Sequence, residues 1–372
     1  MKSTSYLVSG VILTLFICSV SFAPLMKEQQ VNADRTVTFR VKAPDAKQVK
    51  VVNKSDANAM GAAEYEMKKD ANGVWSVTTN PCRPGLHYYQ LNIDGFECPD
   101  PASHKYFGWA WWASALEIPD PNLDFYLPKD VPHGNIRYHW YHSKTTGAVR
   151  NCLIYTPPGY DTQTEKRYPV LYLQHGSGES ELGWTMQGKV NFILDNLIAR
   201  KKALPMIIVM DNGYAARPGA PDPYRPGGQD NRFSDLVIND LVPTIDREYR
   251  TIPNRENRAL AGLSMGAGQA MNIGLANLNI FASIGAFSGG GRSFDPNTSY
   301  SGVFKDASAA NEKIKLLWIG CGDLDGGFAS AKNLHEALTA NGIRHTWFEC
   351  PGSHEWQVWR RHIYEFAQLL FK

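Results

Sequence analysis

The first third of the chain alternates apolar and polar residues with a period of two. The pattern occurs at residues 37–41, 49–51 and 89–93, and the last run is followed by the turn pair Asp94-Gly95. Period-two alternation broken by turn residues is typical of β-strands with one buried face. We therefore predict a small all-β sandwich over residues 32–126.

The remainder of the chain alternates strand-like and helix-like segments. Residues 168–173 and 314–321 predict buried strands, the runs at residues 206–210, 258–263 and 346–350 predict further strands, and residues 266–278 predict a helix. Buried strands that alternate with helices favour a mostly parallel sheet. We predict an α/β domain over residues 127–372. The proline-rich stretch at residues 118–134 is predicted to connect the two domains.

One short motif lies at a predicted junction between a strand and a helix. Residues 262–266 are Gly-Leu-Ser-Met-Gly, a G-x-S-x-G motif. A sharp turn there lifts one hydroxyl above the sheet edge, and the glycines permit a turn that side chains would block. Serine is a weak nucleophile until a base takes its proton. The motif therefore predicts a catalytic Ser264, a histidine base and an acid that orients the histidine.

Residues of the required types follow the next predicted strands. Asp323 and Asp325 come after residues 314–321, and His354 comes after residues 346–350. Parallel sheets build their sites at these strand ends, and the chain order Ser, Asp, His is that of the α/β-hydrolase triad. We predict His354 as the base. Asp325 is our choice of acid because it lies further past its strand, toward the His354 loop, with Asp323 as the alternative.

A glycine-rich turn after the strand at residues 168–173 is the predicted oxyanion site. Backbone N–H groups stabilise the oxygen of a tetrahedral intermediate, and each donor is worth about 10²–10³ in rate. We predict that Gly176 or Ser177 supplies one N–H and that Met265 supplies the other. The His175 ring is expected to hold this turn through a backbone hydrogen bond, because His354 already has the proton-transfer role.

Several segments in this order resemble a known family. They are residues 170–176, 184–188, 191–199, 262–266 and 352–356, followed by Trp359. Together they are similar to the esterase D-like α/β-hydrolases, and within these to carbohydrate esterase family 1, the feruloyl and acetylxylan esterases. The resemblance covers residues 132–372. It implies an α/β-hydrolase fold.

The resemblance also implies roles for individual residues. It makes Ser264, Asp325 and His354 the triad, and it puts Trp184 and Gln187 near the acyl pocket. We add His175 and Trp356 to the predicted substrate-binding residues, since both lie within the matching motifs. The front sandwich resembles the immunoglobulin-like carbohydrate-binding module family 48. The oxyanion turn departs from its relatives, which often carry another glycine or an apolar residue in place of Ser177.

Four functions are compatible with these residues. The first is a feruloyl esterase that releases ferulate from arabinoxylan, favoured because aromatic residues and methionines surround the motifs, namely Trp184, Met186, Met265 and Trp356. An acetylxylan esterase is the second. The third is a siderophore esterase, although its anionic catecholate substrates favour a basic cleft. The fourth is a carbohydrate-binding protein that has lost catalysis, which the presence of Ser264 and His354 disfavours.

Composition and net charge limit the classes of molecule that this protein is expected to bind. The chain has 372 residues, of which 43% are hydrophobic and 20% are charged, and its formal net charge is +2. These values are ordinary for a globular protein of more than one domain, and they disfavour nucleic-acid binding. No Cys/His spacing predicts a zinc site, and the predicted chemistry needs neither metal nor cofactor. The expected partner is acylated xylan or a xylo-oligosaccharide, with the oligomeric state open.

The N-terminus predicts the compartment. Lys2 precedes an apolar stretch at residues 7–23, which ends in Ser21-Phe22-Ala23, a small-x-small cleavage pattern. We predict that residues 1–23 are a cleaved signal peptide, with Val31-Asn32-Ala33 as an alternative cleavage site, that the protein is exported, and that the mature form does not contact the membrane. An uncleaved anchor is the alternative, although this stretch is at the short limit of a membrane span.

Two further features suggest specific contacts. Cys321 and Cys350 lie at the ends of strands that are predicted neighbours, so a disulfide between them would brace the site. Aromatic residues cluster just before residue 113, at Tyr106, Phe107, Trp109, Trp111 and Trp112. Such rings stack on sugars or pack between domains. Both interpretations of the cluster remain open at this point.

Overall fold

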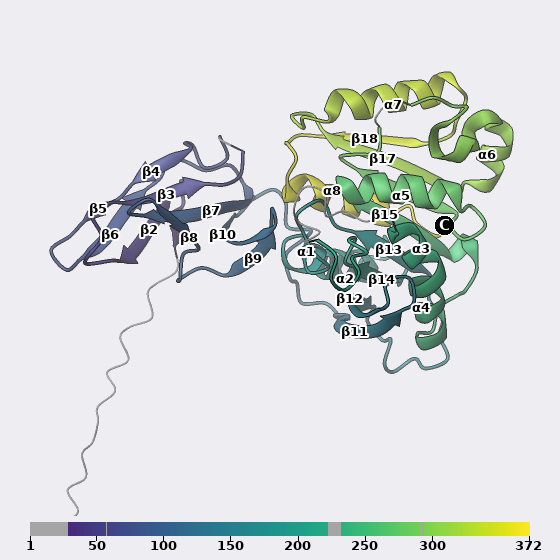
Figure 1. Cartoon of the computed structure of the whole chain (residues 1–372), viewed down its shortest axis with the longest axis horizontal. Coiled ribbons are helices and arrows are strands. Elements are labelled where there is room, and N and C mark those ends of the chain that lie inside the picture. The colour runs from purple at the N-terminus through teal and green to yellow at the C-terminus, as the bar shows by residue number, and fades with distance from the viewer. Residues whose placement is uncertain (1–28, 57, 222–231, 292–293) are drawn as a thin grey trace, which may run out of the picture.

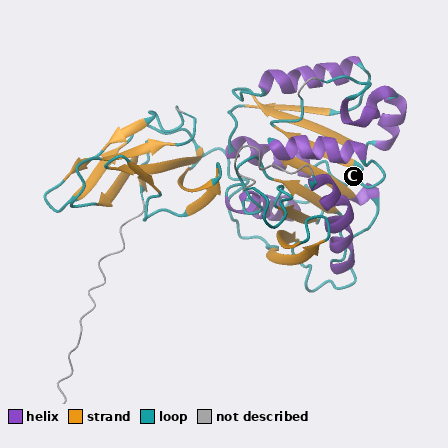
Figure 2. Ribbon diagram, viewed as in Figure 1, coloured by secondary structure: helices purple, strands orange, loops and turns teal. Residues whose placement is uncertain are grey.

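The computed structural model describes the chain except residues 1–28, 57, 222–231 and 292–293. Its front part consists of strands and loops, and its larger second part has helices packed around a central sheet (Figure 1 and Figure 2). The predicted signal peptide, residues 1–23, lies outside the described residues. In the described part of the chain, no helix combines the length and apolar character needed to cross a bilayer.

The front part is built from two antiparallel sheets. The first has the strand order β1 (Gln30–Val31), β2 (Val37–Lys42), β6 (Val74–Thr78), β5 (Lys68–Lys69). The second has the order β4 (Glu64–Glu66), β3 (Val49–Asn53), β7 (Gly85–Ile93), β10 (Trp111–Ile118), β9 (Lys105–Gly108), and β8 (Phe96–Cys98) pairs with β7.

The predicted alternation accounts for the core of this part. Val37, Phe39 and Val41 on β2 are buried, while the residues between them are partly or fully exposed. They contact buried residues of β3, β6, β7 and β10, so one core lies between the two sheets. The prediction of strands with one buried face is confirmed. Burial of these side chains contributes most of the local stability, because apolar area removed from water is the main favourable term in folding.

The second part contains the predicted, mostly parallel sheet. Its strand order is β11 (Asn135–Ser143), β12 (Ala148–Thr156), β14 (Ile207–Asp211), β13 (Val170–Gln174), β15 (Arg258–Leu263), β16 (Ser283–Phe287), β17 (Leu316–Gly322), β18 (Thr346–Cys350). The pairings β11–β12 and β12–β14 are antiparallel, and the other pairings in the sheet are parallel. The strands β13 to β17 are buried on both faces, which explains their continuous apolar runs, while β18 at the edge of the sheet is largely only partly buried.

Helices cover both faces of this sheet. One face is covered by α3 (Phe233–Leu236), α4 (Val242–Glu248), α5 (Met265–Ala276), α6 (Ala307–Lys313) and α7 (Phe328–Ala340), together with the short helices η1 (Val237–Leu241) and η3 (Ser299–Lys305). The short helix η2 (Arg255–Asn257) directly precedes β15. The other face is covered by α1 (Gly183–Met186), α2 (Val190–Ala199) and α8 (Trp356–Ala367). Leu86 and Tyr88 of the front part belong to this second core, so the two parts share buried surface.

An ion pair with a fully buried arginine joins the two parts. The Arg360 guanidinium on α8 donates to both carboxylate oxygens of Glu117 on β10, at 2.7 and 2.9 Å. Arg360 is fully buried and also donates from Nε to the Gln187 carbonyl at 2.8 Å. Its guanidinium lies 4.5 Å from the centre of the Tyr126 ring. This bidentate arrangement fixes the orientation of the front part against α8.

Loss of this ion pair is expected to destabilise the protein. In Glu117→Ala the buried Arg360 charge loses its carboxylate, which we expect to lower the free energy of unfolding by about 3 kcal/mol. Urea titration followed by circular dichroism measures the change. Asp161→Asn is the matched control, since it breaks a pair with Arg137 whose side chains are both about a third or more exposed. The control substitution should lower the free energy of unfolding by less than about 1 kcal/mol. Equal decreases in the two variants would contradict the prediction.

The predicted disulfide is wrong. Cys321 and Cys350 are both free thiols, as are Cys82, Cys98 and Cys152. The strands are neighbours as predicted, but Cys321 lies opposite Glu349 and Cys350 lies opposite Gly322. Because successive side chains of a strand point to opposite faces, this one-residue offset puts the two sulfurs on different faces of the sheet.

Candidate active site

Ser264 lies at a strained turn between β15 and α5. Its backbone angles are φ 53° and ψ −113°, a conformation that residues with a side chain rarely adopt. The flanking glycines are required by close packing. A Cβ on Gly262 would lie 2.6 Å from the backbone of Gly266, and a Cβ on Gly266 would lie 2.6 Å from the His175 carbonyl oxygen. The turn therefore presents the Ser264 side chain at the sheet edge, as the motif predicts.

Asp325 and His354 come together at the same edge. Oδ2 of Asp325 accepts a hydrogen bond from Nδ1 of His354 at 2.8 Å, and Oδ1 accepts from the Gly327 N–H at 2.8 Å. Since Nδ1 is occupied, Nε2 is the nitrogen left to accept a proton. The His354 ring also packs edge-on against Trp359, with ring centres 5.0 Å apart. These contacts hold the imidazole in one orientation.

Asp325 is an ionised carboxylate. Burial alone would raise its pKa, but the hydrogen bond and charge of His354, the Gly327 N–H and the Ser288 side chain more than offset that effect. The pKa of Asp325 therefore lies below its ordinary value. A carboxylate that stays charged beside Nδ1 stabilises the imidazolium that forms when His354 accepts a proton.

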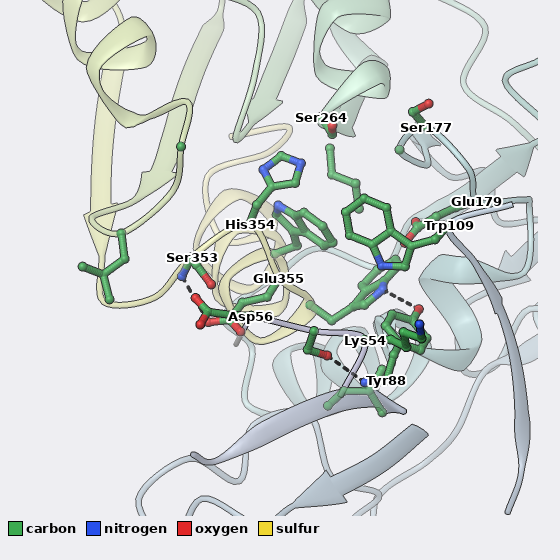
Figure 3. A pocket seen from close by; sticks show the side chains of 18 of the residues that line it. Lys54, Asp56, Tyr88, Trp109, Ser177, Glu179, Ser264, Ser353, His354 and Glu355 are labelled. Carbon is green, nitrogen blue, oxygen red and sulfur yellow. Dashed lines mark hydrogen bonds between the residues drawn. The ribbon is translucent and has the colours of Figure 1, made fainter. Parts of the chain in front are cut away.

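The alternative acid, Asp323, has a different contact. Its Oδ1 accepts from the Gly352 N–H at 2.9 Å, and this contact lies at the surface. The geometry thus separates the two aspartates. Asp325 contacts the imidazole, while Asp323 links β17 to the loop that carries His354. Both Ser264 and His354 line one cavity (Figure 3). No hydrogen bond joins their side chains within the described residues, and in unliganded sites such bonds are often long.

The glycine-rich turn after β13 lies against the nucleophile. A Cβ on Gly176 would be 2.6 Å from Leu263 Cδ1 and 3.3 Å from Ser264 Cβ, so the absence of a side chain brings this turn close to Ser264. Gly176 and Ser177 both line the cavity. Met265 begins α5, and its N–H belongs to the first turn, where N–H groups have no partner within the helix. These are the backbone groups predicted for the oxyanion site.

His175 is a buried structural residue. Its Nε2 accepts from the Gly213 N–H at 2.8 Å, so Nδ1 carries the proton and donates to the Gly176 carbonyl at 2.8 Å. Burial lowers the pKa of His175 to about 4, which keeps the ring neutral. The ring thus holds the turn through backbone hydrogen bonds, as expected, and it does not line the cavity. Its inclusion among the substrate-binding residues was wrong.

Two other predicted substrate contacts also need correction. Trp184 is 1% exposed, donates from Nε1 to the Gln174 carbonyl at 2.9 Å, and packs edge-on against Trp356. Gln187 is fully buried and donates to the Tyr88 hydroxyl at 2.9 Å and to the Phe107 carbonyl at 2.8 Å. Trp184 stabilises the core and Gln187 bridges the two parts of the chain. Neither lines the cavity, whereas Trp356 does.

Residues of both parts enclose the cavity, which has a volume of about 610 Å³. This size is ordinary for small-molecule sites. The front part contributes Lys54, Ser55, Asp56, Leu86, Tyr88, Trp109 and Trp111. The second part contributes Ser264, His354, the oxyanion turn, and apolar side chains that include Leu263, Trp356 and Trp359. Among the described residues, no group of His, Cys, Asp or Glu side chains is arranged to hold a metal ion.

The hairpin β9–β10 brings two tryptophans to the cavity. Its two-residue loop, Trp109-Ala110, has φ angles of 57° and 68°, as a tight hairpin turn requires. The Ala110 N–H donates to the Gly178 carbonyl at 2.7 Å, so the hairpin tip rests on the oxyanion turn. Trp109 and Trp111 are 50% and 46% exposed. Interdomain burial therefore does not explain these two rings, and both remain accessible to a ligand.

Sequence reasoning missed several polar residues of the cavity, and Glu179 and Tyr88 are two of them. Glu179 follows the oxyanion turn, and Tyr88 comes from β7 of the front part. Glu179 lies in the polar run Glu179-Ser180-Glu181, which by itself indicates an exposed loop. Tyr88 is one aromatic residue of a predicted strand. Only the contact between the two parts of the chain brings these side chains together.

A family model confirms what the site indicates. The model described as "Putative esterase" matches residues 143–368. The chain belongs to this esterase family. The strained serine beside a histidine–carboxylate pair is the arrangement expected of a serine-type esterase. This esterase is also 39% identical, over 94% of its length, to an endo-1,4-beta-xylanase/feruloyl esterase of Xylanibacter ruminicola. The chain spans 46% of that longer relative.

Solved structures show the same relationship. A CE1 ferulic acid esterase from Anaeromyces mucronatus, in complex with ferulic acid, is 30% identical and superposes with a TM-score of 0.58. The match covers 68% of this esterase and 96% of that chain. The enterobactin esterase of Shigella flexneri is 18% identical, has a TM-score of 0.65, and covers 92% of this esterase and 94% of its own chain. This second likeness is one of fold, and it extends over the front part.

Proposed function

We propose that this esterase releases ferulate from feruloylated xylan through an acyl-enzyme in which Ser264 is the nucleophile. The observation that carries the proposal is the cavity, where a strained serine and an Asp325-oriented imidazole face an aromatic space. Flat aromatic walls suit a planar cinnamoyl group better than an acetyl group, which fills little of such a volume. The similarity to a ferulic acid esterase with its product bound supports the same acyl group.

The proposed reaction begins with the attack of Ser264 on the ester. Oγ bonds to the carbonyl carbon while its proton moves to Nε2 of His354, and Asp325 stabilises the resulting imidazolium. The carbonyl oxygen gains the negative charge, which the Met265 N–H and the N–H of Gly176 or Ser177 stabilise. The bond to the sugar oxygen then breaks, and His354 returns its proton to that oxygen. Water then attacks the acyl carbon while His354 takes a proton from it, the bond to Ser264 Oγ breaks to release the acid, and His354 returns the proton to Oγ.

The sugar is proposed to leave on the His354 side of the cavity. His354 has to protonate the leaving oxygen, so the alcohol part of the substrate must face the imidazole. Ser353 and Asp56 lie on this side (Figure 3). The exposed rings of Trp109 and Trp111 add surface on which sugars or the acyl group stack. We further propose that the front part is a family 48-like carbohydrate-binding sandwich and that the protein is exported.

A substrate panel tests the proposed function. Purified protein is expected to hydrolyse methyl ferulate and feruloylated arabinoxylan oligosaccharides with kcat/KM at least about 10-fold above that for acetylated xylan, because only the cinnamoyl group fills the aromatic cavity. Released acid is measured by chromatography. Hydrolysis of acetyl esters alone would contradict the feruloyl assignment, and preferential cleavage of catecholate siderophore esters would replace it with another acyl class.

A further inference from the structure

Glu179 is a buried acidic residue in the wall of the cavity. Its side chain is 6% exposed, and its Oε2 has no hydrogen-bond partner within the described residues. The carboxyl group lies near the Trp356 ring, since a Cβ on Gly183 would be 3.2 Å from both. Buried polar atoms are normally hydrogen-bonded. An unbonded oxygen in a ligand cavity is therefore a group that a bound ligand can satisfy.

Glu179 is a neutral acid rather than a carboxylate at pH 7. Burial raises its pKa to about 8, and contacts with the Gly176 backbone and the Trp356 indole offset this only in part. No ion pair involves Glu179 among the described residues, so no cation favours its charged form. A protonated carboxyl group both donates and accepts hydrogen bonds. It suits an uncharged hydroxyl better than an anion.

Tyr88 supplies a second polar group at this place. Its hydroxyl oxygen accepts from Nε2 of Gln187 at 2.9 Å and from Nε1 of Trp356 at 3.2 Å. These bonds use both lone pairs, so its proton is left to donate. Tyr88 and Glu179 line the same cavity, and both lie beside the Trp356 side chain. Gln187 and Trp356 thus orient a donor beside an acid.

This polar pair lies away from the leaving group. Glu179 is on the side of the cavity with Ser177 and Trp109, whereas Ser353 and Asp56 are on the opposite side with His354 (Figure 3). The alcohol must face His354, so the acyl group extends toward the other side. Aromatic side chains lie beside this pair, since Trp109 is near Glu179 in Figure 3 and the Trp356 indole contacts the Tyr88 hydroxyl. A ring between such walls would reach Glu179 and Tyr88 with its polar substituent.

We propose that Glu179 and Tyr88 form the polar end of the acyl pocket and bind the ring hydroxyl of a 4-hydroxycinnamoyl group. The inference rests on the proposed function. In this arrangement the Tyr88 O–H donates a hydrogen bond to the phenolic oxygen, and a Glu179 carboxyl oxygen accepts a hydrogen bond from the phenolic O–H. The pair distinguishes hydroxylated cinnamoyl esters from unsubstituted ones, because an acyl group without the hydroxyl leaves both buried groups unsatisfied.

The test compares two substrates that differ by one hydroxyl. The ratio of kcat/KM for methyl 4-hydroxycinnamate to that for methyl cinnamate is measured for the unaltered protein, Glu179→Leu and Glu179→Gln. Glu179→Leu is expected to lower this ratio at least about 10-fold, mainly through the hydroxylated ester. Glu179→Gln keeps an acceptor and a donor and should retain most of the ratio. An unchanged ratio in Glu179→Leu, including the case in which both esters lose activity equally, would overturn the inference.

A second variant tests the inference if Glu179→Leu does not fold. Tyr88→Phe removes the donated proton and should lower the same ratio several-fold, while a ratio equal to that of the unaltered protein would overturn the role of Tyr88 and Glu179 together. Thermal unfolding of each variant identifies loss of fold. The kinetic results also distinguish failure of the proposed function from failure of this inference. An unaltered protein that cleaves neither cinnamoyl ester contradicts the proposed function, whereas cleavage of both with a variant-independent ratio contradicts only this inference.

Discussion

Replacing Ser264 with alanine is expected to lower kcat on methyl ferulate by about 10⁶-fold, the scale seen when a serine nucleophile is removed. The remaining rate would come from the oxyanion donors and from substrate binding. The substitution removes one oxygen from a turn whose shape is set by Gly262 and Gly266, so we expect the fold to persist. Initial rates with enzyme in excess measure the change, and labelling by a fluorophosphonate probe reports the nucleophile directly.

The control for this variant is another serine in the same domain. Ser234→Ala on α3 changes a residue that does not line the cavity, and it should keep full activity and full labelling. Labelling of the folded Ser264→Ala protein, or a loss of less than about 10²-fold with normal thermal unfolding, would show that another residue attacks the ester. That result would remove the basis of the proposed function.

Replacing Asp325 with asparagine is expected to lower kcat by about 10⁴-fold. Asparagine has nearly the same shape, but its amide does not hold the imidazole with a proton on Nδ1, and it carries no charge to stabilise the imidazolium. Asp325 has the hydrogen bond to His354 and a pKa lowered below its ordinary value, so the charge is present throughout the working pH range. Steady-state kinetics on methyl ferulate between pH 6 and 8 would measure the effect.

Asp323→Asn is the matched control for the acid. Asp323 accepts a hydrogen bond from the Gly352 N–H at the surface, and the asparagine oxygen is able to accept the same bond. Activity within about three-fold of the unaltered protein is expected, because removal of a surface charge has a small effect. Should Asp323→Asn lose as much activity as Asp325→Asn, the assignment of the acid from geometry would be wrong.

Local sequence patterns determined much of this protein. The strained turn at Ser264 follows from Gly262 and Gly266, since the backbone approach of 2.6 Å excludes any side chain at either position. The period-two runs of the front part and the continuous apolar runs of the second part gave the strands and their burial. The placement of Asp325 and His354 after parallel strands brought them to one edge, because the carboxyl ends of such strands meet there.

Tertiary structure alone decided which neighbouring residues line the cavity. Trp184 and Gln187 belong to matching motifs, yet their side chains point into the core and into the contact with the front part. The one-residue offset between β17 and β18 separates Cys321 from Cys350, and no pattern within either strand specifies this register.

The polar end of the cavity likewise could not be predicted from local sequence patterns. Glu179 and Tyr88 are 91 positions apart in the sequence and meet because the front part docks on α8 through Arg360 and Glu117. Residues near in sequence share periodicity that indicates a strand or a helix. Contacts between distant segments depend on the packing of whole domains, which the local alternation of apolar and polar residues does not encode.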